Sequence, residues 1–178
     1  MALKATIYKA ELNISDMDRH YYQSHALTIA CHPSETMERM MVRVLAFALN
    51  AHERLSFTKG LSSDDEPDLW LKSLSDEIEL WIELGQPDEK RIRKACGRAK
   101  NVIIYTYAAR SASIWWEQNK SNLKRFNNLR VLHLKSECVE ALGQMAARTM
   151  DLQCTIQDGQ IWLSDANKNL AIEFVQLE

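Results

Sequence analysis

Residues 78–84, with the sequence IELWIEL, alternate strictly between two kinds of side chain. The even-numbered residues are all apolar, whereas the odd-numbered ones are Glu79, Trp81 and Glu83. A period of two is typical of a strand, so one face turns to a core and the other carries two carboxyl groups and an indole. Pro87 follows closely and favours the first turn of a helix, so a strand runs almost directly into a helix.

A second short strand, residues 68–72 (DLWLK), precedes the first. We expect the two to form a hairpin whose turn is centred on Ser75 and Asp76, because the apolar side chains of both strands then meet on one face. A shift by one residue would separate these partners, since strand faces alternate. On the other face this register opposes Asp68 with Glu83, Trp70 with Trp81, and Lys72 with Glu79.

The opposition of Asp68 and Glu83 is the unusual feature of this register. Directly opposed residues have Cβ atoms about 5 Å apart, so two carboxylates there repel each other. A bound divalent cation would offset the repulsion, and Mg²⁺ prefers carboxylate oxygens together with retained waters. The alternative is a pair of solvated acids at the end of a sheet, where repulsion weakens the fold only slightly. The sequence leaves both interpretations open.

The chain has 178 residues, of which 46% are hydrophobic and 26% charged, as in an ordinary globular domain with its own core. No segment is long and apolar enough to cross a membrane, and the N-terminal residues lack the apolar stretch of a secretory signal. We therefore expect a cytoplasmic protein that does not interact with membranes. The four cysteines form no CxxC pair, which favours reduced, buried thiols. The sequence indicates no oligomeric state.

A net charge of −2 conceals an uneven distribution. Residues 88–135 hold 12 basic and 3 acidic side chains, whereas the segments on both sides are acidic. A basic block of this kind favours a polyanionic ligand such as DNA or RNA. The alternative is a set of solvated helix faces that neighbouring acids neutralise. The candidate phosphate contacts are Arg91, Arg93, Lys94, Arg98, Lys120, Lys124 and Arg125.

Hydrophobic periodicity predicts a mixture of helices and strands along the chain. An N-terminal hairpin should turn at residues 15–18, and another should turn at Asp158 and Gly159. Between Ser34 and Tyr107 the predicted order is helix, three strands, helix, strand. A strand, a helix and a single C-terminal strand over residues 169–178 are also expected. This order indicates an α/β sandwich around a mixed sheet.

Three segments together resemble the YaeQ family of bacterial proteins: PDLW, ELWIELGQPDEKRIRKAC and IIYTYAARSASIWW. The resemblance covers the whole chain and implies a single domain over residues 1–178. That family is similar in fold to the PD-(D/E)XK nucleases, whose sheet is of the restriction-endonuclease-like type. The resemblance thus implies an α+β fold with a nuclease-like core at about residues 34–107. The core would be a mixed sheet flanked by helices, which the N-terminal hairpin and the C-terminal strands extend.

The resemblance also implies a catalytic site. Asp68 and Glu83 match the acids that bind Mg²⁺ in the superfamily, and Glu38 is a candidate for an additional acid on the first core helix. Gly85 stands where the superfamily has a catalytic lysine. Lys90 is the nearest residue that could replace it from the following helix, with Lys94 as another.

For several of these residues an ordinary structural role is the alternative. Glu38 could be an exposed helix acid and Lys90 an exposed lysine, as such residues usually are. Gln86 could line the same cleft, or it could satisfy the start of the following helix by a hydrogen bond.

Three functions are compatible with these residues. The first is Mg²⁺-dependent hydrolysis of phosphodiester bonds in nucleic acid. The second is a nuclease-like domain that has lost catalysis and binds nucleic acid or a protein partner, as the missing lysine suggests. The third is a purely structural or protein-interaction role. Fold resemblance does not decide between them.

Overall fold

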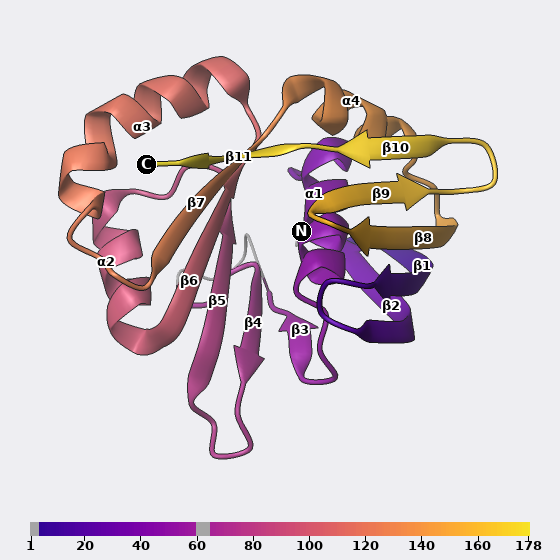
Figure 1. The fold of residues 1–178 in the computed structure, drawn as a ribbon, viewed down its shortest axis with the longest axis horizontal. Coiled ribbons are helices and arrows are strands. Elements are labelled where there is room, and N and C mark those ends of the chain that lie inside the picture. The colour runs from indigo at the N-terminus through magenta and orange to yellow at the C-terminus, as the bar shows by residue number, and fades with distance from the viewer. Residues whose placement is uncertain (1–3, 60–64) are drawn as a thin grey trace. The chain divides into compact units, whose positions relative to one another are not determined.

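The computed structural model describes residues 4–59 and 65–178, which divide into two compact units (Figure 1). Unit 1 contains the chain up to Ala48 together with Glu137–Glu173. Unit 2 contains Leu49–Ser136 and Phe174–Glu178. The single domain over residues 1–178 stays a prediction. None of the helices in the described ranges is both long and apolar enough to cross a bilayer.

Unit 1 is built on a mixed sheet in which, among the described residues, five strands follow the order β10-β9-β8-β1-β2. β1 and β8 are parallel, and the other neighbours are antiparallel. The elements of this unit are β1 (Thr6–Asp16), β2 (Tyr21–Cys31), α1 (Met37–Leu49), α4 (Ser136–Gln144), β8 (Thr149–Gln157), β9 (Gln160–Ser164) and β10 (Asn169–Ile172).

Both hairpins of unit 1 are present, although one turn lies later than predicted. β1 continues to Asp16, so the first turn spans residues 17–20 and not 15–18. The predicted turn at Asp158 and Gly159 is confirmed, with positive φ angles of 52° and 76°. Asp18 also accepts hydrogen bonds from the backbone N–H groups of both turn residues, at 2.8 and 2.9 Å. The first turn is therefore tied to the second.

α1 begins with a side-chain cap. Thr36 accepts a hydrogen bond from the backbone N–H of Arg39 at 3.1 Å, which is the usual contact of an N-cap hydroxyl. The side chains that α1 turns to the core include Met40 and Met41, both at 0% exposure. Gly143 of α4 packs closely against α1, because a Cβ atom there would lie 2.8 Å from Cγ of Glu38 and would require that side chain to move.

Unit 2 contains the second mixed sheet, where the described strands follow the order β11-β7-β6-β5-β4-β3. β5, β6 and β7 are parallel, and helices connect them. The order helix, three strands, helix, strand is confirmed. The elements are β3 (Leu55–Phe57), β4 (Leu69–Lys72), β5 (Ile78–Leu84), α2 (Glu89–Arg98), β6 (Ala99–Thr106), α3 (Ala109–Leu123), β7 (Leu129–Leu134) and β11 (Phe174–Leu177).

The predicted register of the β4–β5 hairpin is confirmed for three pairs and wrong for Lys72 with Glu79, whereas Asp68 lies just before the paired residues of β4. The confirmed pairs are Leu69 with Ile82, Trp70 with Trp81, and Leu71 with Leu80. An irregularity after Leu71 places Lys72 opposite Ile78 and not opposite Glu79. The turn explains the shift: Asp76 adopts a positive φ of 68°, and the N–H of Ser73 donates to the carbonyl of Glu77 at 2.8 Å.

The prediction that the terminal strands extend the core sheet is wrong for most of them. The N-terminal hairpin pairs with β8 and forms a sheet of its own, because Leu12 and Ile14 lie beside Leu152 and Cys154 and all four are buried. The predicted single C-terminal strand is interrupted at Glu173. β10 belongs to the first sheet, and only β11 joins the second, next to β7.

Candidate active site

The two predicted carboxyl groups lie together at one end of the β4–β5 hairpin. Asp68 directly precedes β4, and its backbone N–H donates to the carbonyl of Ile82 at 3.0 Å. Its side-chain Oδ2 accepts a hydrogen bond from the backbone N–H of Leu84 at 2.8 Å. These two bonds join Asp68 to the residues on either side of Glu83. Asp68 and Glu83 are only 3% and 5% exposed.

Glu83 is fixed by two donors that share one oxygen. Trp81 Nε1 donates to Oε1 at 2.9 Å, and Arg91 Nε donates to the same atom at 2.8 Å. Trp81 lies two positions earlier on the same face of β5, which explains why an indole and a carboxyl group alternate in this strand. Oε2 takes part in neither of these two bonds.

The start of α2 determines the position of Arg91. Asp88 is the N-cap residue and accepts the backbone N–H of Arg91 at 2.8 Å. The guanidinium group also donates through Nη2 to the carbonyl of Glu66 at 2.8 Å. Arg91 thus connects Glu83 on β5 to the segment just before Asp68. A cation in this position offsets part of the charge of the buried acids.

The electrostatics of Glu83 follow from these neighbours. Burial raises the pKa of Glu83 from an ordinary value of 4.5 to about 7. The charge of Arg91 opposes this rise, the charge of Asp68 adds to it, and the hydrogen bonds from Trp81 and Arg91 lower the pKa. The site therefore exchanges a proton near neutral pH, as is common for functional carboxyl groups.

Of the other predicted site residues, Gln86 and Glu38 contact residues other than Asp68 and Glu83 in the described part of the chain. Lys90 is exposed, and no hydrogen bond or ion pair in the described ranges joins it to Asp68 or Glu83. Gln86 is exposed and donates through Nε2 to Ser111 Oγ at 2.7 Å. Glu38 belongs to unit 1, where it packs against Gly143. The roles of these residues in the site stay predictions.

Arg91 and Trp81 are the site residues to which sequence reasoning gave no such role. We expected Arg91 to contact phosphates and Trp81 to pair with Trp70, which it does with ring centroids 6.2 Å apart. The sequence does indicate that Asp88 can cap the helix by accepting the backbone N–H of Arg91, but it does not indicate that the Arg91 side chain reaches Glu83. The signal for Trp81 was its spacing of two from Glu83.

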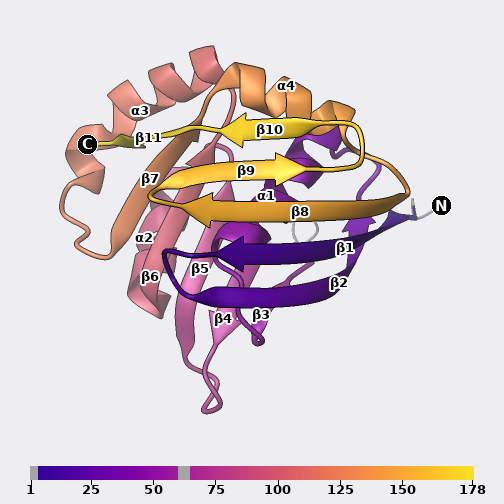
Figure 2. The same ribbon diagram turned by 45° about the vertical axis from the view of Figure 1, so that its right-hand side comes forward.

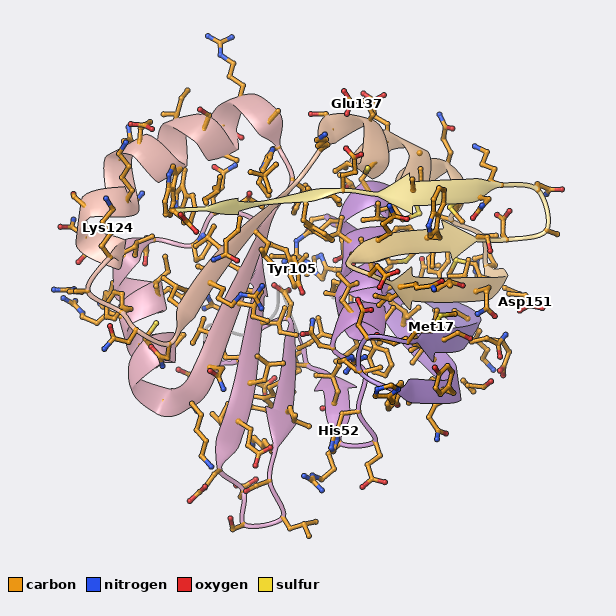
Figure 3. All side chains as sticks on the ribbon, in the orientation of Figure 1. Met17, His52, Tyr105, Lys124, Glu137 and Asp151 are labelled. Carbon is orange, nitrogen blue, oxygen red and sulfur yellow. The ribbon has the colours of Figure 1, made fainter. Side chains whose placement is uncertain are left out.

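Much of the basic block is already paired with acids or carbonyl groups. Lys94 contacts Asp65 at 2.7 Å, and Arg98 donates to the Asp65 carbonyl at 2.8 Å. Arg125 contacts Glu89 at 2.9 Å, and Lys120 contacts Glu117 at 2.8 Å. Arg93 and Lys124 are exposed, and Lys124 lies at the surface beyond α3 (Figure 3). Neighbouring acids thus neutralise part of the block, as the alternative interpretation proposed.

The donor set suits a hard cation that keeps its waters. Among the described residues no group of three or more His, Cys, Asp or Glu side chains could hold a metal ion. Mg²⁺ requires fewer protein ligands, because it is commonly bound by one or two carboxylates with water completing its shell. Asp68 and Glu83 supply such a pair at the carboxyl end of a strand that is parallel to its neighbour β6. This is where ligands bind in open α/β sheets.

Comparison with known proteins identifies the family. The family model described as "YaeQ protein" matches residues 1–174. The chain belongs to the YaeQ family. It is 55% identical to the YaeQ protein of Escherichia coli (strain K12) over 172 residues, which cover 97% of this chain and 95% of the relative. It is likewise 55% identical to the YaeQ protein of Salmonella typhi over 173 residues, which cover 97% and 96%.

Solved YaeQ structures share the fold. The crystal structure of the YaeQ protein from Xanthomonas axonopodis pv. citri superimposes with a TM-score of 0.93 at 47% identity and covers 97% of each chain. That of the YaeQ protein from Pseudomonas syringae also gives a TM-score of 0.93, at 36% identity, and covers 98% of this chain and 96% of the other. The YaeQ fold is therefore a mixed α+β fold with two mixed sheets.

Proposed function

We propose that Asp68 and Glu83 form a divalent-metal centre that hydrolyses phosphodiester bonds in DNA or RNA in the cytoplasm. The observation that carries this proposal is geometric: two carboxyl groups, one just before β4 and one on β5, are 3% and 5% exposed and lie together at one end of a hairpin, where hydrogen bonds join Asp68 to the backbone beside Glu83. Buried acids in such proximity are unfavourable unless a cation compensates them. We further propose that residues 34–107 form a core of the PD-(D/E)XK type, which the order of helices and strands supports.

Each residue has a separate task in this reaction. Asp68 and Glu83 would hold Mg²⁺, which supplies an activated water and neutralises charge that develops on the phosphate. Asp68 is kept in place by the backbone N–H of Leu84, and Glu83 by the indole of Trp81. Both carboxyl groups are thus oriented before a ligand arrives, which reduces the reorganisation needed during the reaction.

Arg91 takes the part that the missing lysine would have played. Gly85 has no side chain to offer charge, whereas the guanidinium group of Arg91 lies 2.8 Å from Glu83. Arginine donates two parallel hydrogen bonds to phosphate oxygens and keeps its charge at all relevant pH values. When a bound Mg²⁺ ion neutralises Glu83, the guanidinium group of Arg91 is available to bind the substrate phosphate. Lys90 lies in the first turn of α2 and Gln86 in the loop before it, and both stay candidates for further substrate contacts.

A cleavage assay tests the proposal. Single-stranded and double-stranded DNA and RNA would be incubated with wild type, Asp68→Asn or Glu83→Gln in Mg²⁺ or Mn²⁺. Asp76→Asn is the matched control, since it removes an exposed acid from the turn of the same hairpin. We expect cleavage by wild type and the control, and at least a hundredfold loss in both site variants. Equal cleavage by wild type and both site variants would refute the assignment.

The ion pair between Arg91 and Glu83 also supports a second candidate, a nuclease-fold domain without catalysis that binds nucleic acid or a protein partner. In that case Arg91 would neutralise Glu83 permanently, and the exposed cations Arg93 and Lys124 would contact phosphates. DNA binding would then weaken steeply with salt, and no divalent metal would produce cleavage. Cleavage that is lost in Asp68→Asn would reject this candidate.

A further inference from the structure

The sheet of unit 1 has one face that its helices leave uncovered. α1 lies behind the sheet in Figure 2, and no helix among the described residues of unit 1 lies over the opposite face, which is turned toward the viewer. Residues on the covered face are buried, among them Leu12, Ile29 and Leu163, each at 0% exposure. The alternate residues of the same strands point outward, and they form the uncovered face.

Two neighbouring rows of this face contain no charged side chain. Cross-strand pairing aligns the first row and the second row residue by residue across the sheet. The first row is Tyr22, Ser15, Thr155, Trp162 and Ala171, and the second is Ser24, Asn13, Gln153, Ser164 and Asn169. Charged residues are the commonest surface residues, so ten adjacent outward positions without one are unusual.

The first row carries two exposed aromatic rings. Tyr22 is 55% exposed on β2, and Trp162 is 39% exposed on β9. Only Ser15 and Thr155 stand between them in the row, so both rings project above small neighbours. Three strand spacings separate β9 from β2, which puts the rings about 14 Å apart across the sheet. Exposed rings with a flat face offer stacking surfaces to a ligand.

The second row opens into a hollow of about 470 Å³. Asn13, Gln153 and Ser164 of that row line it, together with Asp151, Asp165 and Asn167. The side chains of the row are held in place, since Ser24 donates to Asn13 Oδ1 and Gln153 Nε2 donates to Ser15 Oγ at 3.3 Å. The hollow therefore presents fixed amide, hydroxyl and carboxyl groups beside the aromatic row.

The charges around the face decide which polymer it suits. No lysine or arginine lines the hollow, whereas two aspartates do. Asp151, whose side chain lies at the surface of β8 (Figure 3), is the neighbour of Glu11 on β1. Single-stranded nucleic acid also stacks on exposed aromatic rings, but its binding grooves are basic. These carboxylates would repel phosphates, and the two rows without charged side chains favour an uncharged ligand.

We propose that this face binds a neutral oligosaccharide. The apolar C–H side of a sugar ring stacks on Trp162, and its hydroxyl groups exchange hydrogen bonds with Asn13, Gln153 and Asp151. Amide and carboxyl groups suit neighbouring hydroxyls because they accept, or both donate and accept, at two adjacent atoms. The distance from Trp162 to Tyr22 exceeds a single sugar ring, so the ligand is a chain of several sugars. The site is independent of Asp68 and Glu83.

Isothermal titration calorimetry with maltohexaose, cellohexaose and chitohexaose tests this proposal without added metal. We expect saturable binding of at least one of these sugars. Trp162→Ala and Gln153→Ala should each weaken it by about tenfold or more, the size of one lost stacking or buried polar contact. Trp162→Phe should retain part of the affinity. Ile114→Ala is the control, because Ile114 is 52% exposed on α3 in unit 2.

Two results would overturn the proposal. One is the absence of saturable heat with all three sugars, and the other is binding that Trp162→Ala and Gln153→Ala leave unchanged while circular dichroism shows both variants folded. A dT oligonucleotide that binds more tightly than every sugar, with loss in Trp162→Ala, would likewise reject it. Glu83→Gln should leave sugar binding unchanged, so failure here and failure of the proposed metal centre are distinguishable.

Discussion

Replacing Glu83 by glutamine should change the free energy of unfolding in a way that depends on pH. The difference between the variant and wild type should shift in favour of the variant as the pH rises. Glutamine has nearly the same shape and keeps an oxygen that can accept the hydrogen bond from Trp81 Nε1. It cannot ionise, so the variant removes only the charge. Burial raises the pKa of Glu83 above that of an unfolded glutamate, and the folded state therefore holds a proton over a pH range in which the unfolded state has lost it.

The sign and size follow from linkage. A group whose pKa is higher in the folded state contributes stability at low pH, and this contribution is lost as the pH rises through the folded value. For Glu83 the window runs from an ordinary pKa of 4.5 to about 7. At about 1.36 kcal/mol per pH unit, the free energy of unfolding of Glu83→Gln should gain about 2–3 kcal/mol on wild type between pH 5 and pH 8.

Urea unfolding followed by tryptophan fluorescence measures this difference. Four tryptophans, Trp70, Trp81, Trp115 and Trp116, belong to unit 2, so the emission reports mainly on the unit that contains Glu83. Asp76→Asn serves as the control for the loss of one negative charge from the same hairpin. Parallel stability curves for wild type and Glu83→Gln from pH 5 to pH 8 would refute the assigned environment of Glu83.

Four further changes test separate parts of the structure. Mn²⁺ affinity should rise by up to about tenfold per pH unit below pH 7 and level off above it, because Glu83 must lose its proton to bind the ion; calorimetry at several pH values checks this. Asp88→Ala should lower the free energy of unfolding by about 1 kcal/mol through loss of the α2 cap, as measured by urea unfolding. Arg91→Lys should lower kcat in the cleavage assay more than it raises KM for nucleic acid, since lysine cannot make the paired contact. Gly159→Ala should lower the melting temperature, because φ is +76° there, whereas Gly97→Ala, in a helix with no atom near the new Cβ, should not.

The β4–β5 hairpin shows what the sequence could predict. Apolar matching assigned the register of Leu69, Trp70 and Leu71, which the structure confirms. The strict alternation of faces over residues 78–84 is not confirmed, because Ile78 packs in one cluster with Trp81, and Trp81 and Glu83 are buried like Ile82. The predicted partner of Lys72 is wrong because the positive φ of Asp76 shifts the register beside the turn. Local pattern thus determines a regular strand pair but not the backbone irregularity that a turn imposes.

Long-range pairing was beyond the local pattern. β1 and β8 are parallel partners separated by more than a hundred residues, and the sequence pattern of neither strand indicates which strand it pairs with. The sequence therefore gave no reason to divide the strands between two sheets. The role of Arg91 was hidden for a related reason. Its contact with Glu83 depends on how α2 packs against β5. This packing is part of the tertiary structure and cannot be predicted from the spacing of residues in the sequence.

The most direct test of whether the two carboxyl groups bind a common ion is a calorimetric titration with Mn²⁺ at pH 8. It compares wild type, Asp68→Asn, Glu83→Gln and the double variant. One ion should bind per wild-type chain, each single variant should lose at least tenfold in affinity, and the double variant should lose little more than either single one, because the ligands act together. Wild-type affinity that equals that of Asp68→Asn, or losses that simply add, would contradict a shared metal centre.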